Sequence, residues 1–326
     1  MQILPGTAMT GKRLRAAIVG CGARGCNHVE SLKNSNDVVF AAACDPDREL
    51  LKRVCDKYDI PGRFKTVEEM LNRCEIDLAF VATPAHLNAK SSLALLQAGI
   101  HTLMEKPPGL NAAETRQLKA AADNSGAKCM VGWNRRFHPL IVKARELIEA
   151  RGPIVQIVAQ FHKSMQRMDN GRWPDYMMEN LLVETPIHAL DLCRSLAASE
   201  VAAVHPVARR VFSKFIDVYA ALIIFDNGCV AQFTANYTTD ARLERYEMHG
   251  NGISAYLEGI NEGTIVCDGG RFSLDGTADG GGTYEQNQFF IGCIKDDLPI
   301  RPPAADLDEA VKTMGLADKI REGLVP

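Results

Sequence analysis

Residues 14–25 read LRAAIVGCGARG, a short apolar run that closes on a glycine-rich turn. Further apolar runs lie at 38–45, 76–83, 101–107 and 128–133, and amphipathic stretches with a helical period separate them. Runs that are apolar at nearly every position are typical of strands buried on both faces of a sheet. Such strands in alternation with helices predict an α/β fold whose parallel sheet is doubly wound.

Two of the intervening stretches begin with residues that are typical of a helix N-terminus. Thr66 stands three residues before Glu69, and Asn111 stands three residues before Glu114. At this spacing, which is that of a capping box, the first side chain can accept a hydrogen bond from a free N–H group of the first turn. We expect helices at about 25–34, 47–59, 66–74, 85–99 and 111–126.

The pattern changes after about residue 135. Long β-type runs occupy about 201–270, and turn sequences such as Asp226-Asn227-Gly228 separate them, which indicates an antiparallel sheet. The chain thus predicts a tail at 1–11, an α/β domain at 12–135, and an α+β domain with a large, mainly antiparallel sheet at 136–326. The other elements expected in the second domain are a strand at 154–162 and helices at 139–150, 186–197, 284–295 and 305–323.

The composition is that of a globular protein with two domains. The chain has 326 residues, 46% apolar and 24% charged, and its net charge of −3 gives no reason to expect a nucleic acid or an anionic membrane as partner. No apolar run approaches the roughly 20 residues of a membrane helix, and residues 1–11 lack the pattern of a signal peptide. Ten cysteines without a C-x-x-C pair favour free thiols in a reducing cytoplasm over a zinc site.

The glycine-rich turn has the spacing G-x-G-x-x-G, and Asp45 ends the next strand 20 residues after its last glycine. Here glycines allow a tight turn and a close approach to a pyrophosphate, whose charge the helix N-terminus stabilises. Asp45 can accept hydrogen bonds from ribose hydroxyls and would repel a 2′-phosphate, so the pattern predicts NAD rather than NADP. The alternative is a glycine turn beside a surface aspartate. The cofactor-binding residues expected at this turn are Gly20, Cys21, Gly22, Ala23, Arg24 and Gly25.

The order of several short motifs resembles the glucose–fructose oxidoreductase / inositol dehydrogenase family, written Gfo/Idh/MocA. The resemblance covers roughly residues 14–200 and implies an NAD-binding Rossmann domain followed by a substrate-binding domain. The motifs are GCGARG (20–25), CDP (44–46), ATPAHLN (82–88), EKP (105–107), the interdomain segment GWNRRFHP (132–139) and ETPIHALD (184–191). By this resemblance, the residues along the cofactor include Thr83, Pro84, His86, Asn88, Glu105 and Lys106.

The resemblance also implies two catalytic residues, Lys106 and His188. Lys106 follows a buried strand, at the edge where open α/β sheets bind ligands, and its ammonium group could stabilise a developing alkoxide. Histidine, with its near-neutral pKa, suits the removal of a proton from a secondary alcohol. From position alone, Lys106 fits a solvent-exposed lysine equally well, and His188 fits a core histidine of an apolar helical run.

Three positions depart from the family pattern. Glu184 stands where the family usually has Asp, Pro186 where it often has Gly, and Asn88 where many members have His. Because glutamate reaches one methylene further than aspartate, the substrate geometry is expected to differ. We predict that Glu184 orients His188 or binds a hydroxyl group beside the reacting one.

Glu184, His188 and Asp191 also have the spacing of one helical face, so a metal site is an alternative. Pro186 is typical of a first helical turn, with Thr185 as its N-cap, which would place Glu184 before the helix. We therefore expect no metal here and a structural role for Asp191.

Polar and aromatic residues ahead of this helix suit a sugar, because ring faces contact C–H groups and polar groups bind hydroxyls. An ordinary surface loop is the alternative. Arg135 and Arg136 follow the fifth strand, where contact with the cofactor, the substrate or the interdomain seam is equally compatible with the pattern. The expected substrate-binding residues are His162, Trp173 and Tyr176, beside Lys163 and Asp175.

Together these features predict an NAD-dependent dehydrogenase that moves a hydride between nicotinamide and a secondary hydroxyl or ketone of a sugar or cyclitol. The resemblance implies a homodimer or homotetramer that assembles through the C-terminal sheet. One alternative is an NAD-recycling glycosidase of the same fold, for which the altered Glu184 and Pro186 leave room. Another is a non-catalytic NAD(P)-binding regulator, against which the intact Lys106 and His188 argue.

Overall fold

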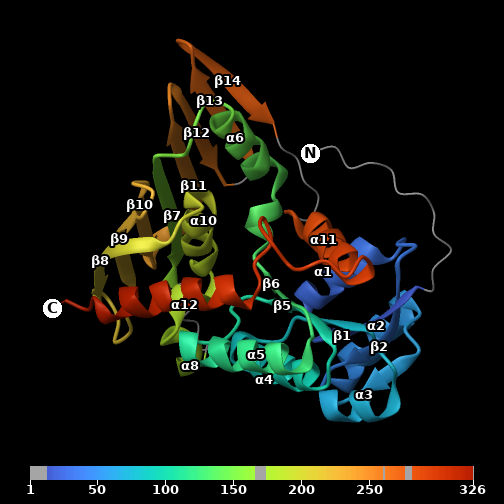
Figure 1. Cartoon of the computed structure of the whole chain (residues 1–326). Helices are drawn as coiled ribbons and strands as arrows, with labels where there is room; N and C mark the ends of the chain where they lie inside the picture. Colours follow the sequence, from blue (N-terminus) through green and yellow to red (C-terminus); the bar gives the residue numbers. More distant parts are fainter. Residues whose placement is uncertain (1–12, 166–173, 260, 276–280, 326) are drawn as a thin grey trace.

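The computed structural model describes residues 13–165, 174–259, 261–275 and 281–325. Figure 1 shows an α/β domain, coloured blue to green, packed beneath a tall sheet whose strands are mostly yellow to orange. In the part of the chain that is described, no helix has both the length and the apolar character needed to cross a membrane. All ten cysteines are described, and each is a free thiol.

A parallel sheet of six strands forms the centre of the N-terminal domain, in the order β3-β2-β1-β4-β5-β6. This is the strand order of a doubly wound Rossmann sheet, so the predicted fold class is confirmed. The strands are β1 (Leu14–Val19), β2 (Val38–Cys44), β3 (Gly62–Phe64), β4 (Leu78–Val81), β5 (His101–Glu105) and β6 (Cys129–Gly132). The helices are α1 (Ala23–Leu32), α2 (Arg48–Tyr58), α3 (Val67–Arg73), α4 (Ala85–Gln97) and α5 (Ala112–Ser125).

Strand β3 is the element of this sheet that the sequence pattern does not reveal. It has three residues and pairs with β2 at the edge of the sheet. A strand this short shows neither a continuous apolar run nor an alternation, so only its pairing identifies it.

The capping side chains act as their spacing predicts. The backbone N–H of Glu69 donates to Thr66 Oγ1 over 3.2 Å, and that of Glu114 donates to Asn111 Oδ1 over 2.9 Å. Both helices therefore begin where the sequence indicates.

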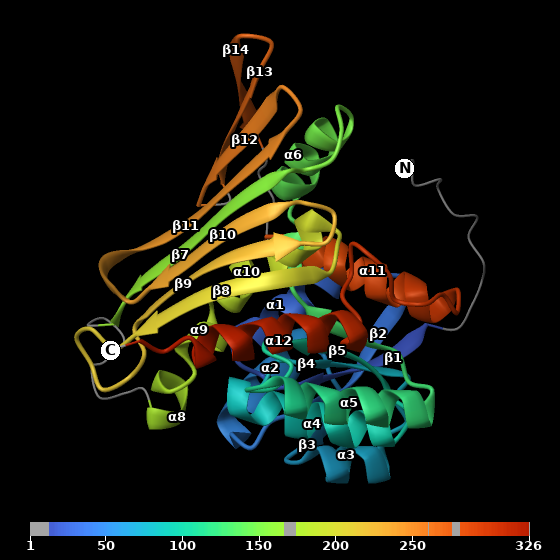
Figure 2. The same ribbon diagram turned by 60° about the vertical axis from the view of Figure 1, so that its left-hand side comes forward.

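The second domain is built on a sheet of eight strands, in the order β14-β13-β12-β11-β7-β10-β9-β8. Neighbouring strands are antiparallel except for β7 and β10, which confirms the mainly antiparallel sheet. Figure 2 shows the twisted sheet with α10 and α12 against one face. Its strands are β7 (Gln156–Ser164), β8 (Val201–Arg209), β9 (Val218–Phe225), β10 (Val230–Asn236), β11 (Thr238–Gly250), β12 (Ile253–Glu258), β13 (Glu262–Cys267) and β14 (Gly270–Asp275).

The helices after β6 connect the two sheets and pack against them. The last two helices pack in different places. Helix α11 packs against α1 of the Rossmann domain, and α12 packs against α5 and β8. The helices are η1 (Asn134–Phe137), α6 (Pro139–Glu149), α8 (Asp175–Met178), α9 (Leu181–Glu184), α10 (Ile187–Ala197), α11 (Thr283–Lys295) and α12 (Leu307–Glu322).

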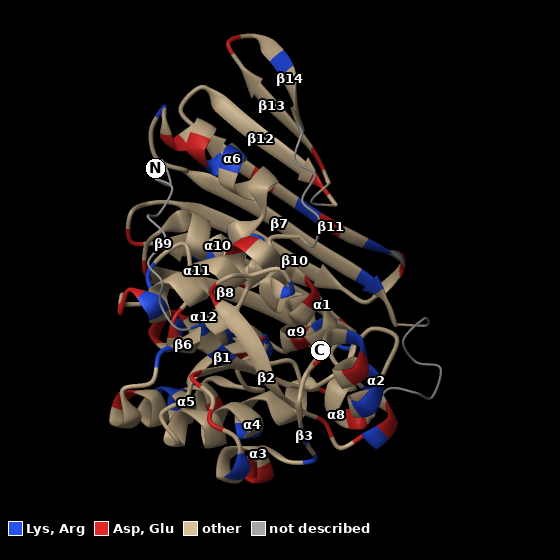
Figure 3. Ribbon diagram, turned by 90° about the vertical axis from the view of Figure 1, so that its right-hand side faces the viewer, with Lys and Arg blue, Asp and Glu red and all other residues tan. Residues whose placement is uncertain are grey.

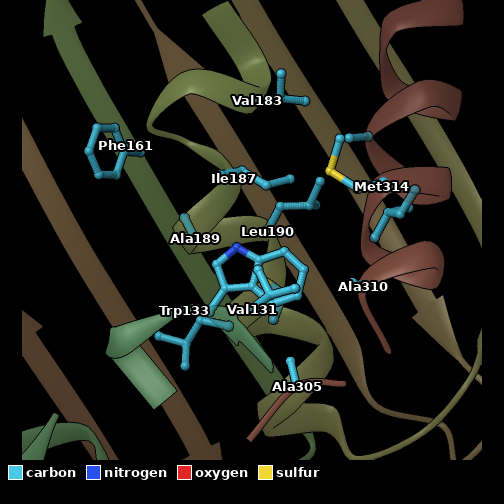
Figure 4. Close-up of a cluster of buried hydrophobic side chains, with 14 of the residues drawn as sticks. Val131, Trp133, Phe161, Val183, Ile187, Ala189, Leu190, Ala305, Ala310 and Met314 are labelled. Carbon is cyan, nitrogen blue, oxygen red and sulfur yellow. The ribbon is translucent and has the colours of Figure 1, made fainter. Parts of the chain in front are cut away.

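The two domains share a continuous hydrophobic core beside β6. Trp133, which is 1% exposed, lies among side chains of α10 and α12, including Leu190 and Met314 (Figure 4). Next to it, Arg136 and Asp191 form a buried ion pair with N–O distances of 2.8 and 2.7 Å. This packing holds the carboxyl edge of the Rossmann sheet against α10.

Candidate active site

A cavity of about 470 Å³ lies where the carboxyl edge of the Rossmann sheet meets the second domain. Open α/β sheets bind ligands at this edge. Residues from both domains contribute to its wall, and they include most of the polar residues that the sequence singles out. The polar and charged ones are Arg24, Thr83, Glu105, Lys106, Asn134, Arg135, Lys163, Glu184, Thr185, His188 and Arg242.

The glycine-rich turn fits the pyrophosphate of a dinucleotide. Gly20 has φ of +94°, and Gly25 packs so closely that a Cβ there would lie 1.9 Å from the carbonyl oxygen of Gly20. At Gly22, by contrast, a Cβ would meet nothing within 4 Å, so the backbone is open to a ligand. Helix α1 begins at Ala23 without a capping side chain, which leaves its first N–H groups for an anion.

Asp45 lies at the end of β2, beside the glycine-rich turn. Its carboxylate accepts hydrogen bonds from the backbone N–H groups of Cys21 (2.8 Å) and Asp47 (2.9 Å). A carboxylate has about four acceptor positions, so these bonds leave capacity for ribose hydroxyls. Asp45 therefore shapes the glycine-rich turn.

Thr83 and Pro84 line the cavity, whereas Asn88 supports it from behind. Asn88 is 1% exposed, accepts a hydrogen bond from Thr83 Oγ1 (2.8 Å) and donates to the carbonyl oxygen of Glu105 (3.1 Å). It thereby fixes the ends of β4 and β5 to each other. His86 does not line the cavity; its ring lies 4.1 Å from that of Tyr176, centre to centre.

Glu105 is the centre of a buried polar network. Its Oε1 accepts hydrogen bonds from Arg24 Nε (2.7 Å) and contacts His28 Nε2 (2.9 Å), and His28 Nδ1 contacts Asn287 Oδ1 (3.0 Å). Burial alone would raise the pKa of Glu105, but Arg24, with His28 and Lys106, lowers it to about 2. No sequence signal points to His28 or Asn287, since Asn287 lies on α11, at the other end of the chain.

Lys106 reaches from the end of β5 into the second domain. Its Nζ donates a hydrogen bond of 2.5 Å to the backbone carbonyl oxygen of Glu184. Burial lowers the pKa of Lys106, although Glu184 and Glu105 act in the opposite direction. The side chain is therefore oriented into the cavity rather than into solvent.

Glu184 ends α9, just ahead of α10, as its position before Pro186 predicts. Lys163 Nζ lies 3.1 Å from Glu184 Oε2 and 2.7 Å from Thr185 Oγ1. The prediction that Thr185 caps α10 is wrong: Pro186 occupies the N-cap position, and the Thr185 hydroxyl is bound by Lys163 and Glu184 instead.

His188, on the first turn of α10, lines the cavity and is 6% exposed. Burial, together with the positive charges of Arg135 and Lys106, holds its pKa well below the ordinary value. Its Nδ1 has no hydrogen-bond partner among the described residues, and buried polar atoms normally have one. A neutral imidazole with an unsatisfied nitrogen suits a ligand-binding role.

The structure does not bring the expected substrate residues together. His162 and Lys163 are neighbours on β7, so their side chains point to opposite faces of the sheet, and Lys163 rather than His162 lines the cavity. Tyr176 packs on His86, and the cavity is lined by its neighbour Met177. Trp173 lies outside the described residues.

The two arginines after β6 take different places. Arg135 lines the cavity and binds Glu244 through two hydrogen bonds, of 2.7 and 3.1 Å. Arg136 is buried in the interdomain seam with Asp191, below the ring of Trp133. Asp191 thus makes a structural ion pair, and no group of three or more His, Cys, Asp or Glu side chains in the described ranges is arranged to hold a metal.

Comparison with protein families covers both domains. Residues 14–133 match the family described as "Oxidoreductase family, NAD-binding Rossmann fold", and residues 141–255 match the GFO/IDH/MocA C-terminal domain. The chain belongs to the Gfo/Idh/MocA family of oxidoreductases. Its relatives in this family include the scyllo-inositol 2-dehydrogenase (NAD(+)) of Bacillus subtilis, which is 25% identical over 276 residues, 80% of each protein.

Other proteins match this chain over different lengths. The D-apiose dehydrogenase of Paraburkholderia graminis is 29% identical over 140 residues, so the match spans 43% of this chain and 37% of that enzyme. Among solved structures, the aldose-aldose oxidoreductase from Caulobacter crescentus complexed with glycerol superposes with a TM-score of 0.85 at 20% identity, over 96% of this chain and 97% of that one. At that identity the likeness supports the shared fold.

Proposed function

We propose that this Gfo/Idh/MocA protein is an NAD-dependent dehydrogenase that moves a hydride between nicotinamide and a secondary hydroxyl or ketone of a small polyhydroxylated substrate. The observation that carries the proposal is the meeting of Lys106, Glu184 and His188 in one cavity at the carboxyl edge of the Rossmann sheet. Lys106 follows β5 of the Rossmann domain, whereas Glu184 and His188 lie on α9 and α10 of the second domain, so side chains of both domains meet at one cavity wall.

The residues at the glycine-rich turn would hold the cofactor. The open backbone at Gly22 and the uncapped start of α1 fit its pyrophosphate, and Asp45 fits a ribose diol. The carboxylate of Asp45 disfavours a 2′-phosphate by charge repulsion, which supports NAD over NADP. When bound, nicotinamide accepts or supplies the hydride.

His188 is the proposed general base. Because its pKa is held low, the imidazole is uncharged near neutral pH and can take a proton from the reacting hydroxyl. The Lys106 ammonium group stabilises the negative charge that develops on the same oxygen, and its bond to the Glu184 carbonyl keeps it in position. Glu184, which Lys163 binds, would orient these groups or bind an adjacent hydroxyl.

We further propose that the protein is a homodimer or homotetramer in the cytoplasm. The face of the second sheet opposite α10 carries exposed apolar residues, among them Leu222 and Leu243, which an interface would cover. Ten free thiols suit a reducing compartment.

The test is a panel of sugars, cyclitols and their derivatives, incubated with NAD and followed by the absorbance of NADH. Stoichiometric NADH together with a ketone product is the expected result. Cleavage of a glycoside without net NADH would instead identify the NAD-recycling glycosidase. Tight NAD binding with no turnover on any member, and no glycoside cleavage, would contradict the dehydrogenase and favour the regulator.

A further inference from the structure

The cavity carries more positive than negative charge. Five basic side chains line it, whereas only three carboxylates contact them, so two positive charges are unbalanced among the described residues. Elsewhere the two signs are mixed: Figure 3 shows basic and acidic residues side by side on α2, α3 and α6. The basic residues of the cavity are Arg24, Lys106, Arg135, Lys163 and Arg242, and the carboxylates are Glu105, Glu184 and Glu244.

One unbalanced charge arises because Glu244 is shared. Arg135 donates hydrogen bonds to both carboxylate oxygens of Glu244. Arg242 donates a single hydrogen bond of 2.9 Å to one of these oxygens. The hydroxyl of Tyr246 donates to the other oxygen as well. Glu244 is 3% exposed in its side chain, but Arg242 is 55% exposed, so the Arg242 guanidinium is open to a ligand.

The second unbalanced charge arises because two lysines share the carboxylate of Glu184. Its carboxylate is bound by Lys163 and Thr185, whereas the Lys106 ammonium group is held by its backbone carbonyl. A carbonyl carries no net charge, so one carboxylate faces two ammonium groups. Charges in a partly buried cavity are costly unless an ion of opposite sign compensates them.

The pyrophosphate of the cofactor is poorly placed to supply that ion. Its expected position is the glycine-rich turn and the start of α1, in the Rossmann domain. Lys163 and Arg242 lie on β7 and β11, which are neighbours in the second sheet. An oxidised nicotinamide ring would add a further positive charge to the cavity.

Resting on the dehydrogenase function proposed above, we propose that the substrate carries an anionic group, a carboxylate or a phosphate ester. Arg242 and Lys163 bind this group while the reacting hydroxyl lies at Lys106 and His188. A guanidinium group matches both anions, since its parallel N–H groups can bind two oxygens at once. The same excess of positive charge helps to keep the His188 imidazole uncharged, as a general base requires.

The experiment compares compounds that share one ring and differ in charge: glucose, glucuronate and glucose 6-phosphate, and inositol with its monophosphate. Binding to the complex of the enzyme with NADH is measured by fluorescence, and turnover by NADH formation from NAD. We expect a charged member to exceed its neutral counterpart by about 10- to 100-fold in kcat/KM or affinity, as for a hydrogen bond to a charged group. Comparison of glucuronate with the two phosphate esters then shows which anionic group the site binds.

Arg242→Gln should remove most of this preference and leave the affinity for NADH within about twofold, while Arg242→Lys should restore part of it. Arg151→Gln is the matched control, because Arg151 is also ion-paired, with Asp268, but lies outside the cavity. Lys163→Gln gives an independent measure should Arg242→Gln fail to fold.

If a neutral compound has the same kcat/KM and affinity as its charged counterpart, the proposal of an anionic substrate is wrong. The dehydrogenase function would still stand. A preference for the charged member that survives Arg242→Gln and Lys163→Gln would also overturn the proposal of an anionic substrate. Arg242-dependent binding of a charged member, without NADH from any compound, would keep the anion site and reject the dehydrogenase. Absence of both binding and turnover would reject both.

Discussion

The Lys106 ammonium group donates a hydrogen bond to the backbone carbonyl oxygen of Glu184, which lies 78 residues further along the chain. The bond joins the end of β5 in the Rossmann domain to the end of α9 in the second domain. A lysine that would otherwise extend into solvent is thereby held beside His188, in the wall of one cavity. The proposed catalytic pair thus depends on the contact between the domains.

Lys106→Ala and His188→Ala should each lower kcat by about 10²- to 10³-fold, because both side chains act on the transition state. The affinity for NADH, measured by fluorescence, should change little. The combined variant should lose less than the product of the two single effects, since the residues act as a unit. Lys128→Ala, which removes a lysine paired with Asp297 away from the cavity, is the control and should keep full turnover. Near-native turnover of His188→Ala would contradict the assignment.

Glu184→Gln removes the negative charge that Lys163 and Lys106 share. If Glu184 positions these groups for catalysis, kcat should fall by about tenfold or more and KM should change little. If it binds a substrate hydroxyl, KM should rise with kcat nearly unchanged. If Glu184→Gln leaves both kcat and KM unchanged, Glu184 has neither of these roles.

Asp45→Ala combined with Pro46→Arg should narrow or reverse the preference for NAD over NADP, because the carboxylate that repels a 2′-phosphate is replaced by a cation. Dissociation constants for NADH and NADPH, measured by titration, test this. Asp45→Asn separates charge from geometry, since its amide oxygen can still accept a hydrogen bond from the N–H of Cys21. Equal affinities of the unmodified protein for both cofactors would count against the role of Asp45.

Asp191→Asn should lower the free energy of unfolding by about 3 kcal/mol, because it removes the carboxylate that Arg136 binds at 2.7 and 2.8 Å and leaves the buried guanidinium with Glu309, at 3.8 Å. Denaturant titration measures the loss, and kcat per folded molecule should remain close to normal. The exposed pair of Arg151 and Asp268 offers the comparison: Asp268→Asn should have little measurable effect. Equal effects at the two sites would refute the structural role of Asp191.

The acid limb of kcat/KM should lie below pH 6.5, where an ordinary histidine takes up its proton. Burial and the nearby cations lower the pKa of His188, so the free base persists as the pH falls through that value. Arg242→Gln removes one of these cations and should move the limb toward higher pH. A limb at or above pH 6.5 in the unmodified enzyme would contradict this account.

The same shift affects folding stability. In the unfolded chain His188 binds a proton near pH 6.5, whereas in the folded protein it remains neutral to lower pH. The unfolded state therefore binds more protons below pH 6.5, and the free energy of unfolding decreases there as the pH falls. Comparison of His188→Gln with the unmodified protein across this range should show a shallower decrease in the variant.

The sequence by itself determined the features that depend on neighbours along the chain. Glycine at positions 20 and 25 is required by a positive φ and by a close approach between turn and helix, and both requirements arise within a few residues. The caps at Thr66 and Asn111, the apolar strands and the turn at Asp226-Asn227-Gly228 are equally local. From them the doubly wound parallel sheet, the antiparallel second sheet and the position of Glu184 before α10 could be predicted.

Only the tertiary structure decided which side chains meet. Alternation along β7 separates His162 from Lys163, but the packing of α10 determines which of the two faces the cavity. The contact of His28 with Asn287 spans 259 positions, and that of Arg135 with Glu244 spans 109. Periodicity and spacing report local geometry, whereas these pairs arise when two sheets and their helices bury a common core, so no pattern within one segment could show them.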